Sequence, residues 1–135
     1  MKKIILVVLA AVLMASCGSK KSKKQVSQDF QINIISVEDN TIELECEEGC
    51  AWTKLSFTKA KFQPQAIDAY GMSIATAPVN TTDQLPDFLF NLERTDNGIA
   101  LESKRGTAWT KLSFNCSEGT DYCIHTVDFN GVSSN

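Results

Sequence analysis

The chain has 135 residues and a formal net charge of −3, with 43% hydrophobic residues. Its charge is uneven, because residues 29–135 hold seven basic against 16 acidic residues, a formal charge of −9. This balance argues against nucleic acid as a partner, since binding nucleic acid requires cations that neutralise phosphates. About 107 residues remain after the amino-terminal segments, which is enough for a single domain at 29–135.

The amino terminus has the order of a secretory signal peptide. Met1-Lys2-Lys3 is basic, Ile4 to Ala15 is an uncharged apolar run, and small residues precede Cys17. The apolar run is shorter than the roughly 20 residues that a transmembrane helix needs. Residues 1–16 are therefore predicted to be a signal peptide that is removed on maturation.

Met14-Ala15-Ser16-Cys17 resembles the lipobox of bacterial lipoproteins. The resemblance implies that Cys17 is acylated and anchors the protein to the membrane, with Gly18 favouring the outer membrane of the bacterial cell envelope. The alternative is a plain secreted protein with a free thiol at Cys17. Residues 18–28 are rich in lysine and serine and lack apolar periodicity, so residues 17–28 are predicted to be a lipidated cysteine and a flexible tether.

The domain contains an internal repeat. Ala51 to Phe57 (AWTKLSF) recurs unchanged as Ala108 to Phe114, an offset in residue number of 108 minus 51, or 57. Apolar and polar residues alternate in short runs between turn signals, which is typical of β-strands. Strands are predicted at Phe30–Val37, Thr41–Cys46, Cys50–Thr58, Gln65–Tyr70, Phe88–Arg94 and Tyr122–Phe129, with two more around Ile99 to Ser103 and in the second heptamer, Ala108 to Phe114.

These eight strands predict an all-β domain, built from duplicated antiparallel meanders that form a sandwich or barrel-like sheet with pseudo-two-fold symmetry. The repeat halves are about 30–73 and 87–130, joined by a linker at Ile74–Pro86. A short helix is the alternative at Gln65–Tyr70. Gly71 and Gly131 are expected to end the fourth strand of each half.

Four further cysteines lie in the domain, and an even number in an exported protein predicts two disulfides. The favoured pairs are Cys46 with Cys50 and Cys116 with Cys123, because each pair stands at the two feet of a short loop. The other two connectivities remain open. A zinc or copper site that uses these cysteines and His125 is a weaker alternative, because their spacings differ from a CxxC knuckle.

The repeated string has two interpretations. Strict alternation places Trp52, Lys54, Trp109 and Lys111 on the outer face, where they form a possible binding surface. A β-bulge near Gly49 or Gly106 would instead shift the phase and bury both tryptophans. The second interpretation is favoured, because large aromatic side chains usually pack.

Two motifs, GTAWxxLSF and AIDxYGM, resemble those of an uncharacterised family of tandemly repeated small β proteins of Gram-negative bacteria. The first is carried by Gly106 to Phe114 and, with Cys50 in place of threonine, by Gly49 to Phe57; the second is carried by Ala66 to Met72. The resemblance implies the repeated architecture and no activity.

The same offset aligns Asp68 with His125, the single histidine, as a thin candidate for an acid/base or metal pair. The sequence contains no other catalytic motif, so no enzyme activity, cofactor or metal is predicted. The expected function is a non-enzymatic binding or scaffolding role for a lipid-anchored envelope protein. The alternative is an inhibitor or immunity-type protein that presents the Cys116–Cys123 loop to a hydrolase.

Overall fold

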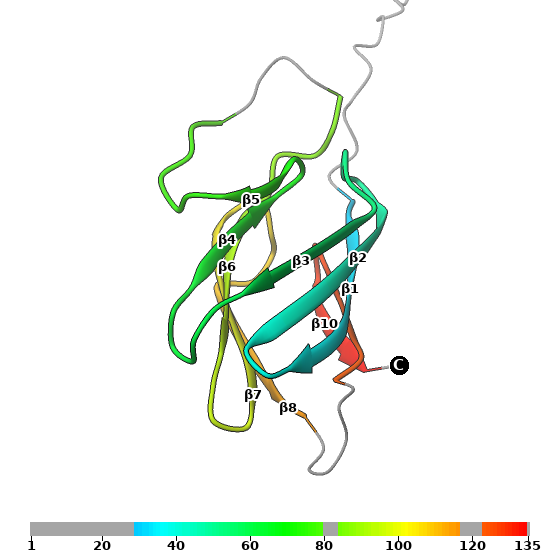
Figure 1. Ribbon diagram of the computed structural model, residues 1–135. Helices are drawn as coiled ribbons and strands as arrows, with labels where there is room; N and C mark the ends of the chain where they lie inside the picture. Colours follow the sequence, from blue (N-terminus) through cyan, green and yellow to red (C-terminus); the bar gives the residue numbers. More distant parts are fainter. Residues whose placement is uncertain (1–28, 80–83, 117–122, 135) are drawn as a thin grey trace, which may run out of the picture.

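The computed structural model describes residues 29–79, 84–116 and 123–134. The predicted signal peptide, Cys17 and the tether lie outside these residues. The described part folds into ten strands in two antiparallel five-stranded sheets, which pack together in a sandwich-like arrangement (Figure 1). It contains no helix of the length and apolar character needed to cross a membrane. The prediction of an all-β sandwich is confirmed.

Sheet A has the strand order β10-β9-β1-β2-β3. Its central meander consists of β1 (Gln31–Glu38), β2 (Thr41–Glu48) and β3 (Lys54–Thr58), and its outer hairpin consists of β9 (His125–Asp128) and β10 (Gly131–Ser134). The hairpin joins the meander through β9, which pairs with β1 over Gln31–Ile34.

Sheet B has the corresponding order β5-β4-β6-β7-β8. It contains the meander of β6 (Leu89–Arg94), β7 (Gly98–Arg105) and β8 (Lys111–Asn115), together with the hairpin of β4 (Gln65–Asp68) and β5 (Gly71–Ser73). Because β4 pairs with β6, the hairpin of each half completes the sheet of the other half. The two halves are therefore interlocked, and neither forms a sheet of its own.

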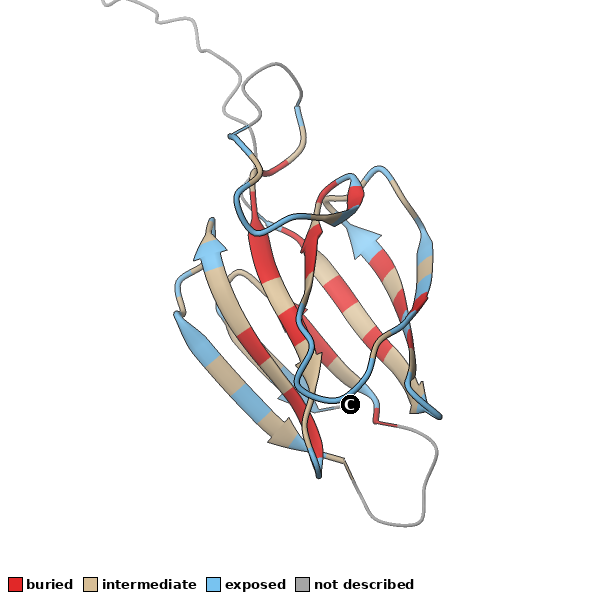
Figure 2. Cartoon of the chain, turned by 60° about the vertical axis from the view of Figure 1, so that its left-hand side comes forward, coloured by how far each residue is buried: buried red, intermediate tan, exposed pale blue. Residues whose placement is uncertain are grey.

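The core lies between the sheets, and buried positions recur along the strands of both sheets (Figure 2). Phe30 and Phe88 precede the central strands β1 and β6, and their rings stack with centroids 4.0 Å apart. The largest fully buried side chains are Phe30, Phe88, Phe90, Ile32, Ile34, Ile42, Leu44, Ile67, Leu89, Leu92, Ile99 and Leu101. Burying each of them contributes about 1.5–3 kcal/mol before the entropic cost of folding is subtracted.

The fourth strand of each half is shorter than predicted. β4 covers Gln65–Asp68, as the strand interpretation has it, and the alternative of a helix there is wrong. The expectation that Gly71 and Gly131 end these strands is also wrong, because both glycines begin new strands. Each follows a two-residue turn and has positive φ, 126° for Gly71 and 150° for Gly131. The short strands β5 and β10 were therefore not visible in the sequence pattern.

The offset between the halves changes along the chain. It is 57 for β2 and β7, which begin at positions 41 and 98, but 60 for the hairpins, which begin at positions 65 and 125. Asp68 therefore corresponds to Asp128, and its alignment with His125 is wrong. The extra positions fall in the segment between β8 and β9. The matched strand order supports an internal duplication with pseudo-two-fold symmetry, which stays our interpretation of these correspondences.

Candidate functional site

The repeated string alternates as predicted within the strands. In β3, Lys54 and Ser56 are exposed, whereas Phe57 is buried. In β8, Lys111 and Ser113 are likewise exposed. The lysines extend into solvent and lie 3.9 Å from Glu45 and 3.8 Å from Glu102 respectively. Such exposed pairs contribute about 0–1 kcal/mol to stability, so they leave these lysines available to a partner.

The tryptophans lie two residues before their strands and are half-buried against the core. The indole nitrogen of Trp52 donates a hydrogen bond to the carbonyl oxygen of Asp68 at 3.0 Å. Trp109 donates to Asp128, also at 3.0 Å. Register shifts, the mark of β-bulges, occur opposite Glu48 and Arg105, immediately before these segments. The structure thus packs both rings against the frame, and a binding role for Trp52, Lys54, Trp109 and Lys111 stays a prediction.

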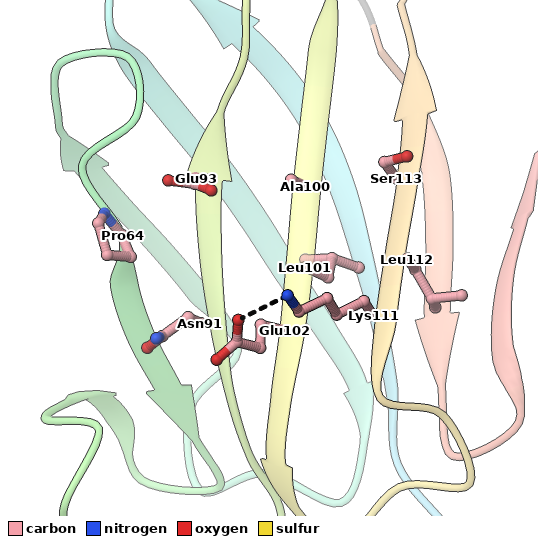
Figure 3. Close-up of a pocket in the computed structure, with 9 residues that line it drawn as sticks. All are labelled: Pro64, Asn91, Glu93, Ala100, Leu101, Glu102, Lys111, Leu112 and Ser113. Atoms are coloured by element: carbon pink, nitrogen blue, oxygen red, sulfur yellow. Dashed lines mark ion pairs between the residues drawn. The ribbon is translucent and has the colours of Figure 1, made fainter.

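A concavity lies on the outer face of sheet B. We call it the β6–β8 hollow; it has a volume of about 360 Å³ and is lined by Pro64, Asn91, Glu93, Ala100, Leu101, Glu102, Lys111, Leu112 and Ser113 (Figure 3). Its outward side chains form two rows that cross three strands. One row is Glu93, Ala100 and Ser113, and the next is Asn91, Glu102 and Lys111.

The small side chain of Ala100 forms the middle of the first row. It is paired with Glu93 on β6 and with Ser113 on β8, so a carboxylate and a hydroxyl flank a methyl group. In Figure 3 the labelled side chains of Glu93 and Ser113 stand on either side of Ala100. This row therefore offers polar groups beside an apolar floor, a combination typical of small-molecule sites.

Sheet A carries the corresponding β2–β3 hollow, of about 290 Å³, which is lined by Ile35, Glu43, Leu44, Lys54, Leu55 and Ser56. Here the middle position of the row is Glu43, paired with Ser36 and Ser56. The carboxylate of the row is thus at the middle position in sheet A, where it belongs to Glu43, but on the outer strand β6 of the row in sheet B, where it belongs to Glu93. The two faces have the same frame but different chemistry.

The two carboxylates of the β6–β8 hollow, Glu93 and Glu102, differ in their interaction partners. Glu102 accepts a hydrogen bond from the Lys104 ammonium at 2.5 Å and lies 3.8 Å from Lys111. The hydrogen bond and charge of Lys104, with a smaller effect from Lys111, hold the pKa of Glu102 below its ordinary value. The Glu93 side chain has no hydrogen bond or ion pair within the described ranges 29–79, 84–116 and 123–134. It is therefore the carboxylate that is open to a ligand.

The loop before β4 forms one rim of the hollow. Pro64 lines it, and the backbone nitrogen of Phe62 donates a hydrogen bond to the Arg94 carbonyl at 2.8 Å, one residue from Glu93. Phe62 is 58% exposed and has a left-handed backbone conformation with φ of 62°. A bulky residue adopts this conformation at an energetic cost, so the backbone of this loop is strained.

The cysteines form the two favoured disulfides. Cys46 and Cys50 have Cα atoms 6.2 Å apart, and those of Cys116 and Cys123 are 4.9 Å apart. These four cysteines therefore have no free thiolate to serve as ligands in the alternative zinc or copper site. Across the described residues, no three His, Cys, Asp or Glu side chains are close enough to hold a metal ion. Residues 117–122 of the second loop lie outside the described residues.

His125 and Asp68 are not brought together. His125 is the first residue of β9 in sheet A, where its ring stacks on Phe114 with centroids 3.9 Å apart. Asp68 ends β4 in sheet B, and its carboxylate accepts a hydrogen bond from the backbone nitrogen of Tyr70 at 2.7 Å. The predicted acid/base pair is therefore wrong.

No family model, curated protein or solved structure matches this chain.

Proposed function

We propose that the protein is a lipid-anchored component of the bacterial cell envelope whose β domain binds a ligand or partner without chemical turnover. The anchor would be the acylated Cys17, and residues 18–28 would form the spacer before the domain begins at Asp29. A fully extended spacer of this length reaches about 40 Å from the membrane surface. The domain would then sample a layer next to the bilayer while remaining attached to it.

The observation that carries the binding role is the β6–β8 hollow. Its first row presents the Glu93 carboxylate, which has no partner among the described residues, together with the exposed hydroxyl of Ser113 and an alanine floor. A row of this kind can recognise a polar ligand, because unpaired groups on a rigid strand need little reorganisation to form hydrogen bonds. The net charge of −9 in residues 29–135 favours ligands that carry positive charge.

Two measurements test this proposal. Mass spectrometry of the protein from envelope fractions should show an acylated Cys17, and Cys17→Ala should release the protein from the membrane. Crosslinking in intact envelopes, followed by purification, should recover a stoichiometric partner or ligand. An unmodified Cys17 would refute the anchor, whereas an acylated protein that crosslinks to nothing would refute the binding role.

The alternative function is an inhibitor or immunity-type protein that blocks a hydrolase with the Cys116–Cys123 loop. Two restraints at the base of this loop favour this function. Cys116 is bonded to Cys123 by a disulfide, and its backbone nitrogen donates a hydrogen bond to the Asn97 carbonyl at 2.8 Å. Such fixed ends lower the entropic cost of presenting a loop. Inhibition of a cell-wall hydrolase that is lost in a Cys116→Ser/Cys123→Ser variant would favour this function over the first.

A further inference from the structure

We propose that the β6–β8 hollow binds a primary ammonium group, with Glu93 as its counter-ion and Asn91 and Ser113 as neighbouring hydrogen-bond partners. This inference rests on the proposed binding function and specifies the class of ligand. Three observations support it: the charge state of the hollow, its two rows of side chains and its difference from the β2–β3 hollow.

The charged side chains of the hollow favour a cationic ligand. Lys104 and Lys111 lie 2.5 and 3.8 Å from Glu102, so that carboxylate already has two cationic neighbours. Glu93 lines the same hollow and has no partner among the described residues. An incoming ammonium would therefore meet an uncompensated carboxylate, and a charge-assisted hydrogen bond is about twice as strong as a neutral one.

The rows of the hollow suit the geometry of an ammonium group. This group carries three donors and no acceptor. Glu93 and Asn91 are two residues apart on β6 and therefore point to the same face, where each offers an acceptor oxygen to the hollow. Asn91 has no side-chain hydrogen bond to any other described residue. The carbon body of the ligand can then lie over Ala100 toward Ser113, where the small side chain leaves room.

The loop at the rim carries an exposed aromatic side chain. Phe62 is 58% exposed and is held beside the Arg94 carbonyl, next to Glu93 in the chain. The β2–β3 hollow provides a contrast, because Glu43 fills the middle of its row instead of leaving an alanine floor. The β6–β8 hollow thus leaves room in the middle of its row for the carbon body of a ligand, which the β2–β3 hollow does not.

Lysine-type side chains and amino sugars both present a primary ammonium, and the experiment separates these sources. Nα-acetyl-lysine amide and glucosamine would be titrated into the 15N-labelled full chain in detergent, with amide shifts recorded by NMR. The matched controls are the same compounds with the amine acetylated. We expect at least one amine to shift the signals of Glu93, Ala100 and Ser113, while its acetylated form shifts none of them.

Two variants locate the site. Glu93→Gln should weaken amine binding by about tenfold or more, the loss typical of a hydrogen bond to a charged group. Glu43→Gln in the β2–β3 hollow is the matched control and should leave binding unchanged. Thermal unfolding of both variants should resemble that of the parent, because both positions lie on outer faces. If Glu93→Gln unfolds, Ser113→Val replaces it, with an expected severalfold loss.

Three outcomes would overturn the inference: no probe binds, acetylated probes bind as well as amines, or Glu93→Gln binds like the parent. Its failure is distinguishable from failure of the proposed function. A crosslinked envelope partner that persists in Glu93→Gln, with no amine binding, leaves the binding role in place and removes the ammonium site. Amine binding to a chain with an unmodified Cys17 would support the ammonium site and refute the lipid anchor.

Discussion

Trp52 is joined to Asp68 by a hydrogen bond from its indole nitrogen to the backbone carbonyl, 3.0 Å long, and this bond links the two sheets. Trp52 precedes the edge strand β3 of sheet A, whereas Asp68 ends β4 in sheet B. Trp109 and Asp128 form the equivalent bond on the other side. Backbone bonds from Ala51 to Ala69 and from Ala108 to Phe129 accompany them. The repeated tryptophan thus closes both open sides of the sandwich.

The first prediction concerns this closure. Trp109→Phe keeps an aromatic ring against Phe90 but removes the donor, so the Asp128 carbonyl loses its partner. We expect the free energy of unfolding to fall by about 1–3 kcal/mol, measured by urea denaturation. Trp109→Ala should cost about 3–5 kcal/mol, because it also leaves a cavity.

Trp52→Phe is the matched control on the other side and should lose stability to a similar extent. If both Phe variants were as stable as the parent but lost binding to an envelope partner, the tryptophans would be ligand contacts instead of closing elements.

The sequence predicts the meanders well because their signal is local. Alternation and the constant offset between the heptamers place β2 and β7, and the spacing of Cys46 and Cys50 indicates the first disulfide. The exchange of hairpins is not local. Nothing in Gln65–Asp68 specifies that it pairs with β6 and not with its own meander, because sheet pairing depends on long-range packing.

The β6–β8 hollow was not predicted for a related reason. The identical heptamers mark residues that the halves share, whereas the hollow arises where the halves differ. Glu93 and Ala100 stand where the other half has Ser36 and Glu43. The aligned halves show that the glutamate changes position in the sequence. Only the strand register shows that the two positions are paired across the sheet and therefore line one hollow.

A second prediction concerns the turn before the second heptamer. Gly106 has φ of 80°, and an added Cβ would lie 2.7 Å from the Phe88 Cα atom and closer still to the Asp87 carbonyl oxygen. Gly106→Ala should therefore destabilise the protein by more than about 2 kcal/mol, from strain and steric overlap together. Gly131→Ala tests the backbone strain without the steric overlap, because nothing lies within 4 Å of the position that its Cβ atom would take. A smaller loss in thermal unfolding is expected there; equal losses would contradict the role of the close contact.

The third prediction concerns pH. The pKa of Glu102 is lowered in the folded state, first by the hydrogen bond and charge of Lys104. A depressed carboxyl pKa contributes stability above the unfolded value, and this contribution is lost as pH falls through the folded value. Lys104→Met should therefore raise the pKa of Glu102 toward its ordinary value, measured by NMR titration. Lys54→Met on sheet A is the control and should leave Glu102 unchanged.

The fourth prediction concerns the disulfides. Each closes a short loop, with sequence separations of 4 for Cys46–Cys50 and 7 for Cys116–Cys123. The paired serine variants should each lose about 2 kcal/mol of stability on the chain-entropy account. Intact mass should show that the parent gains about four hydrogens on reduction, since two bonds are cleaved. Free thiols in the protein from the envelope would contradict this pairing.

The last prediction concerns how the linker between the halves is attached. Arg105 donates to both carboxylate oxygens of Asp87, at 2.9 and 3.1 Å, and to the carbonyls of Ala77 and Pro78 at 2.7 and 2.9 Å. Position 48 in the other half is a glutamate, so this clamp exists once in the described part of the fold. The planar guanidinium makes these bonds simultaneously, which a lysine ammonium on a flexible stem cannot reproduce.

Arg105→Lys should therefore destabilise the protein by about 1–3 kcal/mol, since the pair is partly buried and several acceptors lose their donor. Hydrogen exchange adds a local readout, because the Ala77 amide donates to the Ile74 carbonyl at 3.0 Å in the segment that Arg105 holds. Its exchange should accelerate more than that of β7 amides. Uniform acceleration across the sheet would mean that Arg105 supports the whole fold and does not act as a clamp on the linker.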